Sequence, residues 1–212
     1  IDVRSDAKNN YSDISGAVTG SGALGVGATV VTNVISYEIK AFLANAIVSG
    51  FDKMSVNANS DTTFNTYSVS GAGSGSIAGA GVVETNVINN EVIAYALGDI
   101  KGNNTSTLTV KAKDTANFNG LAGSLAGGLT AGVGATVSIN NVTSTILAYI
   151  GSGANQQINV GDIIVNATGV QNFNDLLSTG FAAGQGSANA TVLVNDIDTL
   201  VKAYICDNSN IK

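Results

Sequence analysis

The stretch NNVTSTILAYI, residues Asn140–Ile150, decides the fold class of this chain. Its apolar residues Val142, Ile146 and Ile150 lie at even spacings from Asn140, so an extended strand places them all on one face. This alternation is typical of a half-buried β-strand. The stretch therefore predicts a strand whose Asn140 face points inward.

The same pattern occurs four times along the chain. Each copy has an Asn, an Ala followed by an aromatic residue eight positions later, and a Val 30 residues before the Asn. The steps between equivalent Val residues are 53, 54 and 55, and the growth falls only between the Ala and the next Val. The recurring positions are Val3, Val56, Val110, Val165, Asn33, Asn86, Asn140, Asn195, Ala41, Ala94, Ala148 and Ala203.

Such constant spacing indicates a stacked repeat architecture, in which each unit buries its core against its neighbours. We divide the chain into the repeats 1–53, 54–107, 108–162 and 163–212, which together form one domain over residues 1–212. The chain begins and ends within the repeating pattern, so we expect it to be a piece of a longer array. We also expect each repeat to be a neighbour and partner of the next.

Composition supports an all-β protein. Only 11% of the residues are charged, well below the roughly 25% of ordinary globular domains. Abundant Val, Ile, Thr and Asn favour strands over solvated helices. The net charge of -6 and the absence of a Lys/Arg run argue against nucleic acid as a partner. No apolar run reaches 18 residues, so we expect no transmembrane segment.

The segments within one repeat have distinct expected roles. In the third copy, Leu108–Ala112 alternates as a strand, whereas the polar Lys113–Asn117 indicates a turn. The following run of small residues, 120–135, predicts a sharp bend or a close approach of neighbouring backbones. A polar or variable position within the later strand predicts a corner at Tyr37, Asn90, Ser144 and Thr199. The stretches that lengthen, 42–55, 95–109 and 149–164, predict protruding, mobile loops.

The recurring Asn residues have a structural rather than a ligand-binding interpretation. In stacked β-coils, identical Asn side chains lie above one another, and their amides can satisfy each other's hydrogen bonds. The aromatic residues Phe42, Tyr95, Tyr149 and Tyr204 recur with the array, so we interpret them as packing elements or as an external aromatic stripe.

The sequence predicts no catalytic residue, cofactor or metal site, and therefore no enzyme. The chain contains no His, which removes the Ser-His-Asp and Cys-His arrangements and the usual zinc sites. Its three Glu and twelve Asp do not recur at equivalent positions in all four repeats, and the densest acidic spot is Asp196-Ile197-Asp198. The single cysteine, Cys206, has no intramolecular disulfide partner and no His to activate it.

Several runs resemble the passenger repeats of large type V-secreted exoproteins of Gram-negative bacteria. The family includes filamentous-haemagglutinin-like adhesins, leukotoxin-like two-partner secretion exoproteins and giant autotransporters. The runs that carry the resemblance are 22–35, 128–142, 146–150 and 163–167. The resemblance implies a right-handed β-helix, or β-solenoid, that forms a stalk on the cell surface. A 53-to-55-residue period exceeds an ordinary coil of that family, so we expect two or three coils per repeat and a stack roughly 40 to 55 Å tall.

Three functions remain open from the sequence. The leading one is a stalk segment of an extracellular, outer-membrane-anchored or secreted virulence adhesin, which gives length and rigidity and binds host surface protein or glycan. The second is a β-helix enzyme that degrades polysaccharide, for which Asp196 and Glu91 are representative carboxylates. The third is the stalk of a secreted leukotoxin-like exoprotein, whose repeats would look the same.

Overall fold

The computed structural model describes residues 1–153, 156–207 and 209–212, apart from the side chains of residues 175 and 176. The described residues form strands and connections but no helix, which confirms the all-β prediction. The strands are β1 (Asp2–Ser21), β2 (Leu24–Ser49), β3 (Lys53–Ser74), β4 (Ile77–Lys101), β5 (Thr107–Gly128), β6 (Ala131–Gly151), β7 (Ile158–Asn159), β8 (Asp162–Ala183) and β9 (Gly186–Ile205).

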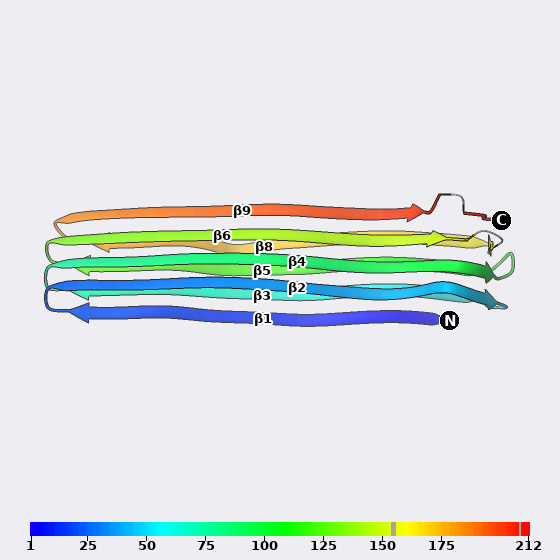
Figure 1. The fold of residues 1–212 in the computed structure, drawn as a ribbon, viewed down its shortest axis with the longest axis horizontal. Coiled ribbons are helices and arrows are strands. Elements are labelled where there is room, and N and C mark those ends of the chain that lie inside the picture. Colours follow the sequence, from blue (N-terminus) through cyan, green and yellow to red (C-terminus); the bar gives the residue numbers. More distant parts are fainter. Residues whose placement is uncertain (154–155, 208) are drawn as a thin grey trace.

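The strands form two parallel sheets. The first sheet has the order β1-β3-β5-β8 and the second has the order β2-β4-β6-β9, with the short β7 paired to β4. The long strands all run along the same axis of a flat slab, with β1 at one edge, β9 at the other, and both chain ends on one short side (Figure 1). This arrangement is compatible with a β-solenoid.

Each sequence repeat supplies one long strand to each sheet. Val3 pairs with Val56, Val56 with Val110, and Val110 with Val165. We call one such pair of strands a coil, and each repeat therefore forms a single coil. The expectation of two or three coils per repeat was wrong, because the strands are 20 to 26 residues long. Four coils at about 4.8 Å spacing stand only about 19 Å tall, whereas each strand extends about 70 to 85 Å.

The strands are long because they continue through two segments at which the sequence predicted an interruption. Lys113–Asn117, predicted as a turn, continues β5 with Asp114 and Ala116 buried and Lys113 exposed. The predicted corner is also absent, since Asn90 and Ser144 lie buried in the middle of β4 and β6. A polar side chain can remain in a strand interior when hydrogen-bond partners meet it there, and Asn90 Nδ2 and Ser144 Oγ both donate to the buried Asp114.

The run of small residues does contain a bend. β5 ends at Gly128 and β6 begins at Ala131, so the chain reverses over residues 129–130, and equivalent two-residue connections occur at 22–23, 75–76 and 184–185. A Cβ placed at Gly128 would lie 2.6 Å from the Ser76 carbonyl oxygen, so the neighbouring coil approaches too closely for a side chain.

The lengthening segments are shorter loops than predicted. β2 and β4 continue to Ser49 and Lys101, which leaves only residues 50–52 and 102–106 as connections. The third connection, 152–161, contains β7, and its residues 154 and 155 lie outside the described part of the chain.

The core lies between the two sheets in three clusters. The largest surrounds Met54, Leu108 and Ile146, the second contains Phe64 and Phe118, and the third consists of alanines. Alternate residues of β3, β4, β5 and β6 are buried, whereas every residue of β9 is exposed. The side chains that point outward from the two sheets are therefore the ones available for binding.

Candidate functional site

The four recurring Asn residues form a continuous hydrogen-bonded ladder across the second sheet. Asn33 Nδ2 donates to Asn86 Oδ1 at 2.9 Å, Asn86 Nδ2 to Asn140 Oδ1 at 2.8 Å, and Asn140 Nδ2 to Asn195 Oδ1 at 2.8 Å. Each amide thus points in the same direction along the stack. The recurring Ala and Val residues also lie in register, in the rows Ala41–Ala94–Ala148–Ala203 and Val3–Val56–Val110–Val165.

Two rows of stacked aromatic rings accompany the ladder. The inner row, Tyr11–Phe64–Phe118–Phe173, has ring centroids 5.3, 4.9 and 4.6 Å apart. The outer row, Phe42–Tyr95–Tyr149–Tyr204, has spacings of 5.0, 4.9 and 5.1 Å. Phe42 and Tyr204 at its ends are 48% and 40% exposed, so this second row is the external aromatic stripe that the sequence suggested.

A cavity of about 380 Å³ separates the inner aromatic row from the Asn ladder. Its lining includes all four rings of the inner row together with Asn33, Asn86 and Asn140. Asp13 also lines it, and Asn33 Nδ2 donates to the Asp13 carboxylate at 3.1 Å. The cavity reaches the exposed first coil at Ser12, Thr32 and Val34, and in the inner coils its rings and amides contribute to packing.

A buried carboxylate organises a second set of interior polar groups. Asp114 has no exposed surface and accepts hydrogen bonds from Ser144 Oγ at 3.0 Å, Asn90 Nδ2 at 3.1 Å and Gln171 Nε2 at 2.9 Å. Tyr37 Oη lies 3.4 Å from the same carboxylate. Burial, and then the charge of Asp114, raise the pKa of Tyr37 to about 12. Tyr37, Asn90, Ser144 and Gln171 come from four different coils, so this cluster fastens the coils together and is closed to a substrate.

The outer face of the first sheet carries the candidate binding surface. Because successive residues of a strand alternate between faces, Asp2, Arg4, Asp6 and Lys8 of β1 point away from the core. Register places further outward residues beside them in two rows, Arg4–Asn57–Lys111–Asn166 and Asp6–Asn59–Lys113–Thr168. We define the charged surface as Asp2, Arg4, Asp6, Lys8, Asn57, Asn59, Asp61, Lys111 and Lys113.

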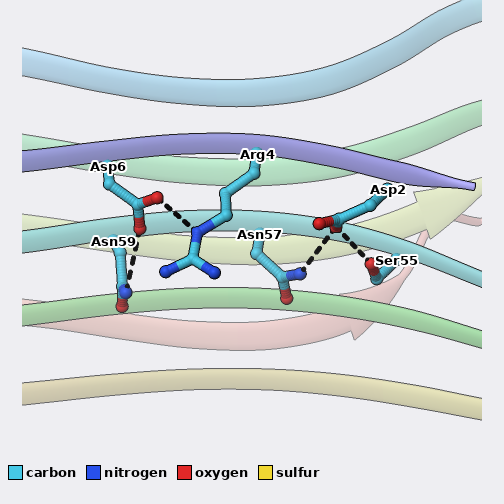
Figure 2. A network of polar contacts seen from close by, with 6 residues as sticks. All are labelled: Asp2, Arg4, Asp6, Ser55, Asn57 and Asn59. Carbon is cyan, nitrogen blue, oxygen red and sulfur yellow. Dashed lines mark hydrogen bonds and ion pairs between the residues drawn. The ribbon is translucent and has the colours of Figure 1, made fainter.

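Hydrogen bonds across β1 and β3 order one end of the charged surface (Figure 2). Arg4 forms an ion pair with Asp6, and Asn59 Nδ2 donates to the other Asp6 oxygen at 3.1 Å. Ser55 Oγ and Asn57 Nδ2 both donate to Asp2. The hydrogen bond and charge of Arg4 lower the pKa of Asp6, so its carboxylate stays ionised in mildly acidic solution.

Lys111 and Lys113 extend this surface onto β5. Both are exposed, and they line a shallow hollow together with Arg4, Asn57 and Asn59. Sequence reasoning did not find this gathering, since about a hundred residues separate Arg4 from the two lysines and only the coil register brings them together. The alternation Lys-Ala-Lys was the one available signal. Aspartates lie among the cations, so the surface has mixed charge and differs from a phosphate-binding strip.

The carboxylates considered from sequence do not converge. Glu91 points outward from β4, in a row with Glu38 and Thr145, whereas Asp196 lies on β9 in a row with Asn141. Among the described residues, no group of three or more Cys, Asp or Glu side chains could hold a metal ion. Cys206 is a free thiol, and burial raises its pKa, which disfavours the reactive thiolate.

Comparison with known proteins gives no match to a family model, a curated protein or a solved structure. Within the described part of the chain, no helix is long and apolar enough to cross a membrane. The functional conclusion therefore depends on the geometry of the two sheets and their outer faces.

Proposed function

We propose that the chain is a segment of the stalk of a secreted or surface-anchored bacterial adhesin, folded as a right-handed β-solenoid. The observation that carries the proposal is the parallel pairing of four coils, which aligns one Asn ladder and two aromatic rows across the whole stack. An array of this kind lengthens by adding coils, each of which needs only its neighbours to fold.

Stiffness follows from the dimensions of the slab. Each coil contacts the next along two strands of at least 20 residues, so bending the stack would disrupt many parallel hydrogen bonds at once. The gain in reach is small, about 4.8 Å for each repeat. Most of each repeat therefore adds width and two broad outer faces rather than length. Such a shape suits a stalk that also presents a binding surface.

The charged surface supports an adhesive role toward host glycan or host surface protein. Asn57, Asn59 and the lysines offer hydrogen-bond donors, and the aspartates and Asn oxygens offer acceptors. Hydroxyl groups of a glycan can use both kinds. A binding row of such side chains repeats from coil to coil, so weak contacts gain strength when several are made together.

An enzymatic role has less support than the stalk. The chain has no His, Asp114 is enclosed by its hydrogen-bond donors, and Glu91 and Asp196 belong to different rows. A glycosidase needs two carboxyl groups on either side of one bond. Glu38 and Glu91 are register neighbours on the outer face of the second sheet, but the hydrogen bond from Lys40 lowers the pKa of Glu38, whereas a general acid needs a raised pKa.

A panel of immobilised glycans and matrix proteins tests the adhesive role, with retention and turnover scored on the same samples. We expect retention on at least one ligand and a several-fold loss for Lys111→Ser/Lys113→Ser. The matched control is Lys202→Ser, which removes a cation from the second sheet and should retain binding. Antibodies to the purified chain should also label intact cells of the organism that makes it.

Three results would count against the proposal. Release of new reducing ends that disappears in Asp196→Asn or Glu91→Gln would favour the polysaccharide-degrading enzyme. Labelling only after cell lysis would exclude the surface location. Equal loss of retention in the Lys202→Ser control would show that the charged surface is not the binding face.

A further inference from the structure

The end of the slab that carries the turns exposes aliphatic side chains on both outer faces. The turns 22–23, 75–76, 129–130 and 184–185 lie at one short side, opposite the chain ends (Figure 1). Near them, six outward-facing aliphatic residues of the two middle coils, β3–β4 and β5–β6, are 36% to 54% exposed. We define the apolar tip as these six residues: Val69, Ile77, Val83, Leu125, Val133 and Ile139.

The exposure of the apolar tip belongs to the outer faces of the sheets. β3, β4, β5 and β6 each have a parallel partner strand on both sides, so a further coil added to the stack would not cover these residues. Val69 and Leu125 lie on the first sheet, and the other four residues lie on the second. Whatever covers the apolar tip must therefore surround both faces of the slab.

The interior of the same region contains small and polar side chains. Ser68, Ser70, Ser124 and Thr136 lie between the sheets and are at most 4% exposed, beside a cluster of alanines. Thr136 Oγ1 lies 2.9 Å from Ser124 Oγ. In water, apolar side chains gather inside a protein. Here the polarity is reversed, and strands that face lipid have this distribution, with apolar residues outside and polar residues inside.

The reversed polarity follows from the short distance between the sheets near the turns. A Cβ placed at Gly132 would lie 2.4 Å from the Ala183 carbonyl oxygen, and a Cβ placed at Gly27 would lie 2.4 Å from the Gly71 carbonyl oxygen. The interior therefore has no room for large side chains at these positions. The large aliphatic residues of this part of the slab point outward instead.

The length of the apolar region matches the thickness of a bilayer. The outward positions of residues 121–128 on β5 are Leu or Gly, and those of residues 131–139 on β6 are Ala, Val or Ile. At about 3.3 Å per residue these segments extend about 26 and 30 Å. The hydrocarbon core of a typical bilayer is about 30 Å thick.

Side chains typical of a membrane boundary follow where the apolar region ends. Tyr67 lies at this point of β3 and is 38% exposed, and tyrosine is enriched where a membrane meets water. The next outward row contains Asn65 and Asn119, whose amides form a hydrogen bond of 2.9 Å. On β6, the outward residue after Ile139 is Asn141. Both sheets thus change from apolar to polar at a similar distance from the turns.

The chain around the turns is free of charge. The stretches 14–37, 62–83, 115–161 and 176–195 contain no Asp, Glu, Lys or Arg. Glu84 follows the second stretch, but it points between the sheets and is 1% exposed. A charged side chain in hydrocarbon is costly, and the outward residues of this region avoid that cost.

We propose that the turn end of the slab inserts from one side into the hydrocarbon layer of a phospholipid bilayer, while the charged surface stays in water. In the middle coils, the strand backbone pairs with neighbouring coils on both sides, so its polar groups do not need water. The expectation of no transmembrane segment was based on uninterrupted apolar runs. The proposed insertion requires none, because only alternate residues of a strand face outward.

Tryptophan fluorescence tests the insertion directly, because the chain contains no Trp. Leu125→Trp lies in the apolar tip, Tyr67→Trp at its boundary, and Thr115→Trp at an outward position in the polar half of β5. With phosphatidylcholine vesicles, the emission of Leu125→Trp should shift to shorter wavelength and be quenched most by lipids brominated near the bilayer centre. Tyr67→Trp should be quenched most by lipids brominated near the headgroups. Thr115→Trp is the matched control and should change with neither lipid.

Charged variants test whether the apolar tip is the inserting surface. Leu125→Asp/Val133→Asp should lower partition into the vesicles, measured by flotation, at least about tenfold, because carboxylates are unfavourable in hydrocarbon. Thr63→Asp/Thr109→Asp adds the same charge at outward positions of the polar half and should retain partition. All four residues point outward, so circular dichroism should show unchanged strand content in both variants.

The proposal does not depend on the proposed adhesive role, and the two can fail separately. The vesicles carry neither glycan nor protein, and Lys111→Ser/Lys113→Ser should bind them as well as the unmodified chain does.

Several outcomes would refute the insertion. A chain that does not float with the vesicles would exclude it, and equal quenching of Thr115→Trp would show contact along the whole sheet. Partition that disappears at high salt would indicate electrostatic adsorption. A blue-shifted Leu125→Trp without lipid, with dimers in sedimentation velocity and no flotation, would assign the apolar tip to a second copy of the chain.

Discussion

Replacing Asn86 with Ala should be one of the most damaging single substitutions in the Asn ladder. Asn86 is buried, and its amide joins three neighbours: it accepts from Asn33, and donates to Asn140 at 2.8 Å and to Glu84 at 2.7 Å. Three lost hydrogen bonds cost about 3 kcal/mol at about 1 kcal/mol each. Leaving the buried Glu84 carboxylate without this donor adds about 1 to 3 kcal/mol.

The free energy of unfolding should therefore fall by about 5 kcal/mol, a large part of the roughly 5 to 15 kcal/mol of a typical domain. The cost should decrease along the ladder. Asn140→Ala breaks two rungs and should cost about 2 kcal/mol, whereas Asn195→Ala breaks one exposed rung and should cost about 0.5 kcal/mol.

Urea unfolding followed by circular dichroism measures these differences. Adding Glu84→Gln to Asn86→Ala supplies a second arm of the test. Removing the Glu84 carboxylate should restore about 1 kcal/mol or more of the free energy of unfolding that Asn86→Ala loses. Equal costs at Asn86 and Asn195 would refute the reasoning, since the ladder would then not depend on burial. A double variant no more stable than Asn86→Ala alone would show that Glu84 does not need the amide.

Three further predictions concern other parts of the slab. Phe64→Ala should lower the free energy of unfolding by about 3 to 5 kcal/mol, because its ring is buried in the inner aromatic row, and Tyr95→Ala in the outer row by about 1 kcal/mol; equal losses in urea would contradict this. The pKa of Tyr37 is raised to about 12 from 10.0, so its contribution is complete below pH 10 and is lost as the pH rises toward 12. Unfolding measured from pH 9 to 12 should show an alkaline loss of at most about 2 kcal/mol that Tyr37→Phe lacks, and an identical profile in the variant would argue against it. Gly128→Ala should cost at least about 2 kcal/mol because its Cβ would meet backbone oxygens, whereas a Cβ at Gly127 meets nothing within 4 Å and Gly127→Ala should be neutral or slightly stabilising in thermal melts.

The rows of stacked Asn, Ala and Val residues could largely be predicted from the sequence. The spacing of Asn33, Asn86 and Asn140 was sufficient to predict that these residues would lie above one another, and they do. The Ala and Val rows were predicted on the same basis. A constant spacing between repeats has this power because a parallel stack must place equivalent positions side by side to bury the same face in each coil.

The length of the strands was misjudged because polarity was read as exposure. Lys113–Asn117 has the composition of a turn, yet Asp114 lies inside and finds its donors on residues 24, 30 and 57 positions away. No local window of sequence contains those donors. The same error turned Asn90 into a predicted corner, whereas two or three coils per repeat were expected because the 53-to-55-residue period exceeds an ordinary coil of the resembled family.

The charged surface shows a different limit. Arg4 and Asp6 are two residues apart on one strand, whereas Lys113 becomes their neighbour only after registers of 53 and 54 residues are imposed. The repeat period was found from the inward-facing residues. The same period applied to the outward-facing positions would have predicted the two rows of the charged surface.

The sequence by itself determined the all-β class, the four-fold repetition and the residues that stack, because alternation and spacing report directly on which face of a strand is buried. Only the tertiary structure decided how the chain folds within one repeat, and with it the single wide coil, the enclosed Asp114 cluster and the charged surface. These features depend on partners that lie one or more coils away. A buried polar group is stable only where it finds hydrogen-bond partners. Here those partners are distant in the sequence, and the stacking of coils brings them to the buried group.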